Sequence, residues 1–268
     1  MKKRILIFIM ALSALSLTAF GIINWNHSAA DEVETSGNMS VASVDQMVMD
    51  VNNNAIYDFF YGIGTRFNSI KRDKLLKAKS FDDFIGKDHA GRIVSYKSLS
   101  VIILEDSKQT NIKETGDSGV LTAQQLKLLH SADYSTNIMI RADYTEYKNM
   151  AGEFEDSYWT PHLTIVPEKQ ALYAKSMDVL IDYLRENSKE ITANVKKDKV
   201  QPGKLYFTVT KNGTISNVRV MSTSGFPSID ESMIELITKM PGIWEPAENS
   251  KGEKVDQDLV LSFGSMGC

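Results

Sequence analysis

The chain has 268 residues, of which 43% are hydrophobic and 24% are charged, and this is the composition of a folded globular protein. The net charge is −4, and three of the 30 basic residues precede the first acidic one, Asp31, so the rest of the chain is more acidic still. A chain without a basic surface is not expected to bind nucleic acid. A single cysteine, Cys268, and four separated histidines exclude a disulfide scaffold and a locally spaced zinc site, so we expect no metal and no cofactor.

Residues 1–26 have the pattern of an export signal. Basic residues at positions 2–4 precede a stretch of 19 residues without a charge, Ile5 to Ile23. Small residues at two places fit cleavage by a signal peptidase, while 19 residues are also just enough to cross a bilayer. A cleaved signal peptide and a retained inner-membrane anchor therefore both remain open. In either case we expect the rest of the chain in the cell envelope, on the periplasmic side.

A polar tether is predicted over residues 27–55 and a small α+β middle domain of unassigned role over residues 56–167. The aromatic run from Ile56 to Phe67 is expected to pack into this middle domain, because an exposed aromatic patch would aggregate. Further along, Asn137 begins the first of two strand-like stretches that are separated by a polar loop typical of a hairpin.

Two short motifs of the middle domain predict where helices begin. Ser80 with Asp83 and Thr122 with Gln125 both have the spacing of a capping box, in which each side chain bonds the other residue's backbone N–H. The second motif predicts a helix from about residue 123 to residue 131.

A second domain is predicted over residues 170–268, beginning with an amphipathic helix that contains Met177 to Leu184. Asn212-Gly213 between two alternating runs predicts a two-residue hairpin. Ser228, with Glu231 three residues later, predicts the start of a second helix, and the chain then ends in a last strand. The expected fold class is α+β, and the second domain is expected to be a three-stranded antiparallel sheet in the order β-β-α-β with one covering helix.

This order and the residues that form it resemble the carboxyl-terminal domain of TonB-family proteins, of the Bacteroidetes type. The resemblance covers about Gln201 to Gly264, roughly a quarter of the chain, and includes the runs "FTVTKNGTISNVRVMSTSG" and "MPGIWEPAENSKGEKVDQDLVLSF". The positions that match the markers of the family pattern are Gly213, Gly225, Asp230, Pro241, Trp244, Pro246, Ala247 and Gly252.

The resemblance implies a periplasmic domain that binds an extended segment of an outer-membrane transporter or another envelope protein. It also implies a link to an inner-membrane proton-driven motor and a role in energised transmembrane transport. The implied binding site is the edge of the last strand, to which a partner strand adds. Its residues are Lys254, Val255, Asp256, Gln257, Asp258, Leu259, Val260, Leu261, Ser262 and Phe263. Charges on this strand are equally suited to protecting an unused edge from aggregation.

Two features argue against a working energy transducer. All six prolines lie beyond residue 160, so the chain lacks the stiff proline-rich spacer of the usual TonB architecture. The uncharged segment Ile5 to Ile23 also lacks an ionisable group that proton flow would act on. A periplasmic structural or assembly module therefore remains the alternative. We do not expect an enzyme, because the sequence contains no nucleophile elbow, Walker loop, Rossmann fingerprint or zinc helix motif.

Overall fold

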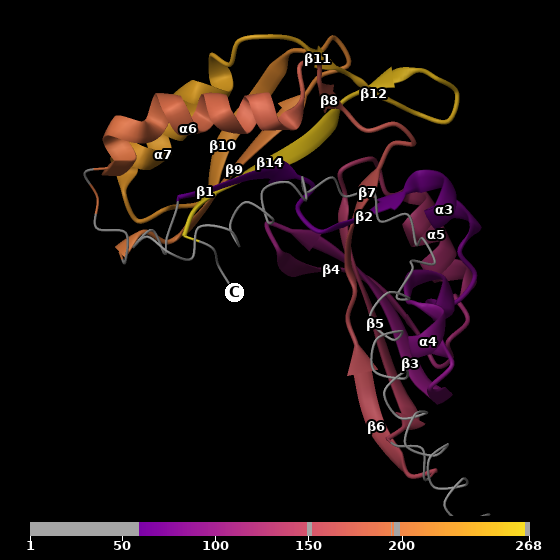
Figure 1. Cartoon of the computed structure of the whole chain (residues 1–268). Coiled ribbons are helices and arrows are strands. Elements are labelled where there is room, and N and C mark those ends of the chain that lie inside the picture. Colours follow the sequence, from indigo (N-terminus) through magenta and orange to yellow (C-terminus); the bar gives the residue numbers. More distant parts are fainter. Residues whose placement is uncertain (1–58, 149–151, 194, 196–198, 266–268) are drawn as a thin grey trace, which may run out of the picture. The chain divides into compact units, whose positions relative to one another are not determined.

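The computed structural model describes residues 59–148, 152–193, 195 and 199–265, all of which belong to one unit of the chain (Figure 1). The fold is mixed α+β, as predicted, and contains more strand than helix. The expected signal or anchor segment (1–26), the tether (27–55) and Cys268 lie outside the described residues. Within the described residues, no helix is long and apolar enough to cross a membrane.

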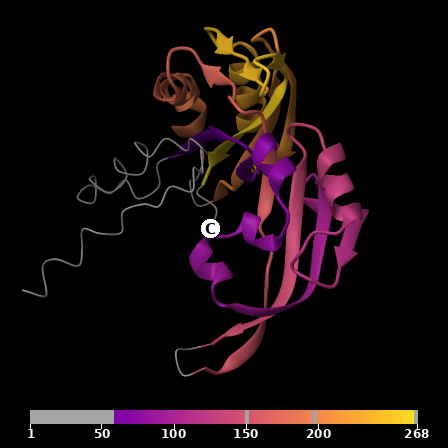
Figure 2. The ribbon, with the colours of Figure 1, turned by 90° about the vertical axis from the view of Figure 1, so that its right-hand side faces the viewer.

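The first sheet is built from the middle of the chain, and its strands lie in the order β2-β7-β5-β3-β4, with β6 paired to the second half of β5. Three helices and a 3₁₀ turn pack on one face of this sheet, which is turned toward the viewer in Figure 2. The strands are β2 (Asn68–Lys71), β3 (Ile93–Glu105), β4 (Lys108–Gly116), β5 (Asn137–Tyr147), β6 (Phe154–Trp159) and β7 (His162–Val166). The helical elements are α3 (Arg72–Lys77), η1 (Phe81–Phe84), α4 (Lys87–Ala90) and α5 (Ala123–Ser131).

Both capping boxes are confirmed. Thr122 Oγ1 accepts the backbone N–H of Gln125 at 3.2 Å, and Gln125 Oε1 accepts the N–H of Thr122 at 2.8 Å, so α5 begins where the sequence predicts. Ser80 and Asp83 form the second box at the start of η1. These local patterns decide the helix starts because all of their partners lie within one turn of chain.

The second sheet is formed by four antiparallel strands in the order β1-β14-β9-β10. Helices α6 (Met177–Ala193) and α7 (Pro227–Thr238) contact each other and cover one face of this sheet (Figure 1). The strands are β1 (Phe60–Gly64), β9 (Pro202–Val209), β10 (Ile215–Ser222) and β14 (Gln257–Gly264). Two short strand pairs flank the sheet: β8 (Leu172–Tyr173) with β11 (Trp244–Glu245), and β12 (Ala247–Glu248) with β13 (Lys254–Val255).

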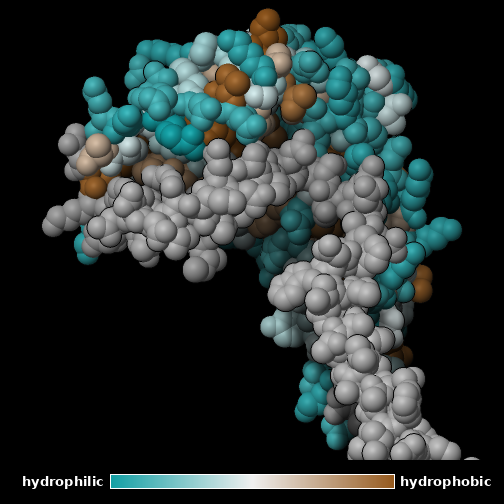
Figure 3. Space-filling view, in the orientation of Figure 1, coloured by the Kyte–Doolittle hydropathy of each residue, from teal (hydrophilic) through white to brown (hydrophobic). Residues whose placement is uncertain are grey.

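Three large aromatic residues lie together in the core under α6 and α7. Trp244 is 3% exposed, and its ring centroid lies 5.9 Å from that of Phe207 and 5.6 Å from that of Tyr173. Ile237 of α7 and Leu184 of α6 are fully buried in the same cluster. The surface of this region that faces the viewer in Figure 3 is mainly hydrophilic with scattered hydrophobic residues, as expected for amphipathic helices.

Three predictions about this region are wrong. The sheet has four strands instead of three, because β1 joins it, and two covering helices instead of one, because α6 packs beside α7 on the same core. The β9–β10 loop is not a two-residue turn: Thr210 donates to the carbonyl of Thr214 at 2.9 Å, and only Gly213 of the loop between them has a positive φ (77°). A two-residue turn of the predicted type needs two such residues. Helix α7 begins at Pro227, without a side-chain cap from Ser228.

Candidate functional site

The predicted binding strand is an interior strand in this structure, and the expectation of an open edge at β14 is therefore wrong. On one side β14 pairs with β9 along its whole length. On the other side β1 pairs with it antiparallel, from Phe60 opposite Gly264 to Gly64 opposite Val260. The aromatic run that contains β1 was expected to pack into the middle domain, but its buried residues belong to the second core.

The direction of each backbone amide of β14 follows from one hydrogen bond. The amide of Asp258 donates to Ser135 Oγ at 2.8 Å and so points away from β9. Because successive amides of a strand alternate in direction, those of Val260 and Ser262 point toward β1, and those of Leu259 and Leu261 point toward β9. Every amide of β14 that a guest strand would need is thus already engaged or faced by a partner.

Strand β1 is held mainly by two side chains. Tyr61 and Ile63 are 5% and 4% exposed and lie in the core beneath α6. The hydroxyl of Tyr61 is hydrogen-bonded to the hydroxyl of Ser188, which is buried on α6. Burial raises the pKa of the Tyr61 phenol above its usual value. Gly62 lies between these two residues and carries no side chain. Strand β1 therefore contacts the core through the side chains of Tyr61 and Ile63.

The charged and polar residues of the predicted edge make contacts within the chain. Asp256 accepts the backbone N–H of Lys211 at 2.7 Å, and Asp258 accepts hydrogen bonds from the hydroxyls of Thr208, at 2.7 Å, and Tyr206. Gln257 is buried and accepts the N–H of Ala171 at 2.7 Å. These side chains therefore fix the strand in place.

The predicted strand from residue 254 to residue 263 is in fact two elements. Lys254 and Val255 form β13 and pair with β12 across a turn at Gly252, whose φ is 76°. Asp256 separates β13 from β14. Core-facing Leu259, Leu261 and Phe263 are almost fully buried, and Val260 is 5% exposed on the opposite face, so only Ser262 of this group is half-exposed.

The eight marker positions have structural contacts. Asp230, buried at the start of α7, accepts the N–H of Ser224 at 2.9 Å and the hydroxyl of Thr223 at 2.5 Å. A side chain at Gly213 would collide with the carbonyl of Trp244. Trp244 lies in β11 and is buried in the core. The other five lie in loops, turns or short strand pairs of the same region: Gly225, Pro241, Pro246, Ala247 and Gly252.

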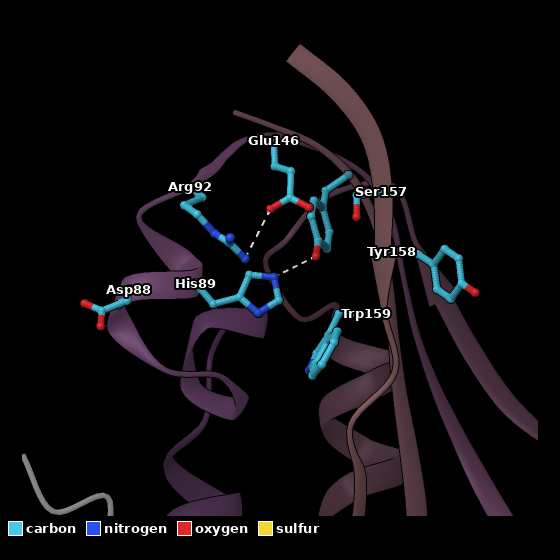
Figure 4. Close-up of a pocket in the computed structure, with 8 residues that line it drawn as sticks. Asp88, His89, Arg92, Glu146, Ser157, Tyr158 and Trp159 are labelled. Carbon is cyan, nitrogen blue, oxygen red and sulfur yellow. Dashed lines mark hydrogen bonds and ion pairs between the residues drawn. The ribbon is translucent and has the colours of Figure 1, made fainter. Parts of the chain in front are cut away.

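A separate cleft of about 510 Å³ lies in the middle sheet, between α4 and strands β5 and β6 (Figure 4). His89 Nε2 and the hydroxyl of Tyr144 are 2.7 Å apart, and Arg92 Nη2 lies 3.6 Å from Glu146 Oε2. The rings of His89 and Trp159 meet edge to face with centroids 5.2 Å apart. The remaining lining residues are Asp88, Ser157 and Tyr158.

Sequence reasoning missed this cleft. The signal that points to it is the alternation of β5, in which Ile140, Ala142 and Tyr144 face the core and Glu146 follows in the same row. His89 and Arg92 line the cleft only because α4 packs over this end of the sheet. No local sequence pattern predicts the packing of α4 against β5. No group of histidine, cysteine, aspartate or glutamate side chains that could hold a metal occurs in the described part of the chain.

Comparison with known proteins adds no relative: no family model matches the chain, and neither a curated protein nor a solved structure matches it.

Proposed function

We propose that this protein is a cell-envelope binding module in which β14 accepts an extended segment of an outer-membrane transporter or another envelope protein. In this proposal β1 is a resident strand that the partner displaces. The resemblance to TonB carboxyl-terminal domains supports the choice of partner. A link to a proton-driven motor and energised transport belong to the same proposal, and an assembly module without energy transduction is the alternative.

The observation that carries the proposal is the pairing of β1 with β14. Strand β9, strand β10, helix α7 and β14 follow one another in the carboxyl-terminal part of the chain, whereas β1 comes from the opposite end of the described residues. Strand addition binds through backbone N–H and C=O groups, and alternate side chains give specificity. The chain's own segment already uses this mode, with Tyr61 and Ile63 as its anchors.

Displacement of β1 is physically reasonable because β1 is short. It covers five of the eight residues of β14 and contributes two anchors, whereas β9 pairs with all eight. A guest segment with two bulky apolar anchors would restore the same hydrogen bonds and fill the same pockets. Exchange then costs little free energy overall.

A reversible lock of β1 tests the proposal. Gly62 and Ser262 lie directly opposite each other, and opposed residues of antiparallel strands lie within the Cα distance that a disulfide spans. The full chain would carry Gly62→Cys and Ser262→Cys with Cys268→Ser. Its probe is a fluorescent peptide with the sequence FFYGIGTR, residues 59–66 of the chain.

We expect the reduced protein to bind the peptide and to retain an envelope partner from solubilised outer membranes, and the oxidised protein to do neither. The same preparation with and without reductant is the matched control, and Cys268→Ser alone controls for the reductant. Equal partner retention by the oxidised protein would refute strand addition at β14 and favour the assembly module.

A further inference from the structure

The cleft of the middle sheet contains the carboxylate of Glu146 at a position whose neighbours on the same face of β5 are buried, mostly apolar side chains. Along β5, the residues that face the helices are Ile138, Ile140, Ala142 and Tyr144, all of which are at most 1% exposed. Glu146 is the next residue of this row and is only 9% exposed. A buried carboxylate destabilises a protein unless hydrogen bonds or an opposite charge compensate it.

That compensation is incomplete within the chain. Glu146 Oε2 is buried and accepts no hydrogen bond from the described residues. The nearest cation, Arg92 Nη2, lies 3.6 Å away, an ion-pair distance that leaves the hydrogen bond unmade. The Arg92 side chain is 59% exposed, so its N–H groups are accessible from the open side of the cleft. The carboxylate of Glu146, which lines the cleft, and the accessible guanidinium of Arg92 are therefore the two charged groups that a ligand can meet.

The remaining walls supply shape and apolar surface. His89 and Tyr144 satisfy each other through their hydrogen bond, and this contact holds α4 against β5. Trp159 lies beside His89 and is 50% exposed, so part of its indole surface is free (Figure 4). Asp88 and Tyr158 are directed away from Glu146 in the same view, and we assign them no role.

We propose that this cleft binds a free α-amino acid with an apolar side chain. Its ammonium group would donate to the carboxylate of Glu146, and its carboxylate would accept the paired N–H groups of Arg92. The side chain would lie against Trp159. The cleft volume of about 510 Å³ is within the range of small-molecule sites.

The proximity of the two protein charges selects a zwitterion. A simple cation bound to Glu146 would face the positive charge of Arg92, and a simple anion bound to Arg92 would face Glu146. An α-amino acid carries both charges on substituents of one carbon atom and so matches two opposite protein charges 3.6 Å apart. The site is independent of the strand exchange proposed for β14, because none of its lining residues belongs to that sheet.

Calorimetric titration of the full chain with L-phenylalanine tests the proposal. We expect saturable binding, and affinities about tenfold or more lower for L-phenylalanine amide, which lacks the carboxylate, and for N-acetyl-L-phenylalanine, which lacks the ammonium. Glu146→Gln and Arg92→Gln should each weaken binding of L-phenylalanine by a similar factor. Glu155→Gln is the matched control, because Glu155 lies opposite Glu146 on β6 but is exposed and does not line the cleft.

Several outcomes would overturn the proposal. Absence of binding at millimolar L-phenylalanine would exclude the ligand class. Equal binding of the amide would indicate a site for a simple amine or a peptide amino terminus, and equal binding of the N-acetyl compound would indicate a simple carboxylate. Unchanged binding by Glu146→Gln would place the ligand elsewhere. The amide and N-acetyl comparisons use the unaltered protein and do not depend on the folding of a variant.

Discussion

The two sheets of this protein leave different kinds of groups for a partner. In the carboxyl-terminal sheet, the core-facing side chains Leu259, Leu261 and Phe263 of β14 are apolar and buried. The groups of this strand that a partner could bind are the backbone amides on the side where β1 pairs. In the middle sheet, β5 has paired neighbours on both sides, and the unmet group is the side chain of Glu146. Backbone pairing accepts many sequences, whereas a buried carboxylate beside an arginine selects functional groups. The two proposed sites would therefore differ in how strictly they select a partner.

The largest expected effect is on the core that supports β14. Trp244→Ala should lower the free energy of unfolding by about 3 to 5 kcal/mol, because a large buried side chain is replaced by a cavity next to Phe207 and Tyr173. Urea denaturation measures the change. Ile243→Ala is the matched control: this neighbouring side chain is 71% exposed, and its loss should change stability by at most about 0.5 kcal/mol. Similar values for the two variants would contradict the buried role of Trp244.

The second prediction concerns alternate amides within the one strand β14. If β1 detaches more readily than β9, the amides of Val260 and Ser262 should exchange with deuterium about tenfold or more faster than those of Leu259 and Leu261. Residue-resolved exchange measured by NMR provides the test, and the β9-facing amides are an internal control. Equal protection of all four amides would mean that β1 is as firmly held as β9 and would count against displacement.

A smaller effect is expected from the hydrogen bond that anchors β1. Tyr61→Phe should destabilise the protein by about 1 kcal/mol, because one buried hydrogen bond, between the hydroxyls of Tyr61 and Ser188, is lost while Ser188 still donates to the carbonyl of Leu184. Tyr147→Phe is the control, since Tyr147 is 46% exposed. An unchanged free energy of unfolding in Tyr61→Phe would show that the hydrogen bond contributes nothing net.

The same tyrosine predicts a dependence on alkaline pH. The pKa of Tyr61 is raised by burial, so its contribution to stability is fully present below the unfolded value, near 10, and is lost as pH rises through the folded pKa. The unaltered protein should therefore lose more stability above about pH 10 than Tyr61→Phe does. Tyr206, whose pKa burial and its hydrogen bond to Asp258 also raise, remains in both proteins and contributes equally to each. Parallel stability curves for the two proteins would contradict the burial of the Tyr61 phenol.

The smallest change is expected at the cleft. Glu146→Met should leave the free energy of unfolding within about 1 kcal/mol of the original value, or raise it, because an apolar side chain of similar size suits the row that contains Ile140. Ile140→Ala, in the same row, should cost about 2 to 5 kcal/mol. A large loss of stability in Glu146→Met would show that the ion pair with Arg92 is structural, and the contrast between the two sheets would lose its basis.

The sequence alone predicts the elements of this protein whose determinants are local. The α5 capping box between Thr122 and Gln125 and the apolar spacing of α6 are both found in the structure. Leu205, Phe207 and Val209 alternate along β9 and are buried in the core, as expected because alternation along a strand indicates which side chains face inward. Each of these features depends on residues within a few positions of one another, so its hydrogen bonds or its periodicity can be recognised in the sequence.

Only the tertiary structure decides the two candidate sites. Strand β1 could have paired with any exposed edge, and its choice of β14 depends on pockets for Tyr61 and Ile63 that exist only after α6 has packed on the sheet. The cleft likewise depends on a contact between His89 and Tyr144, which lie on different elements. Alternation does place Glu146 on the inner face of β5, but whether that face is covered at this position is settled by the packing of α4. A strand can pair with many other strands of similar local sequence. Which pairing forms depends on the packing of the whole fold.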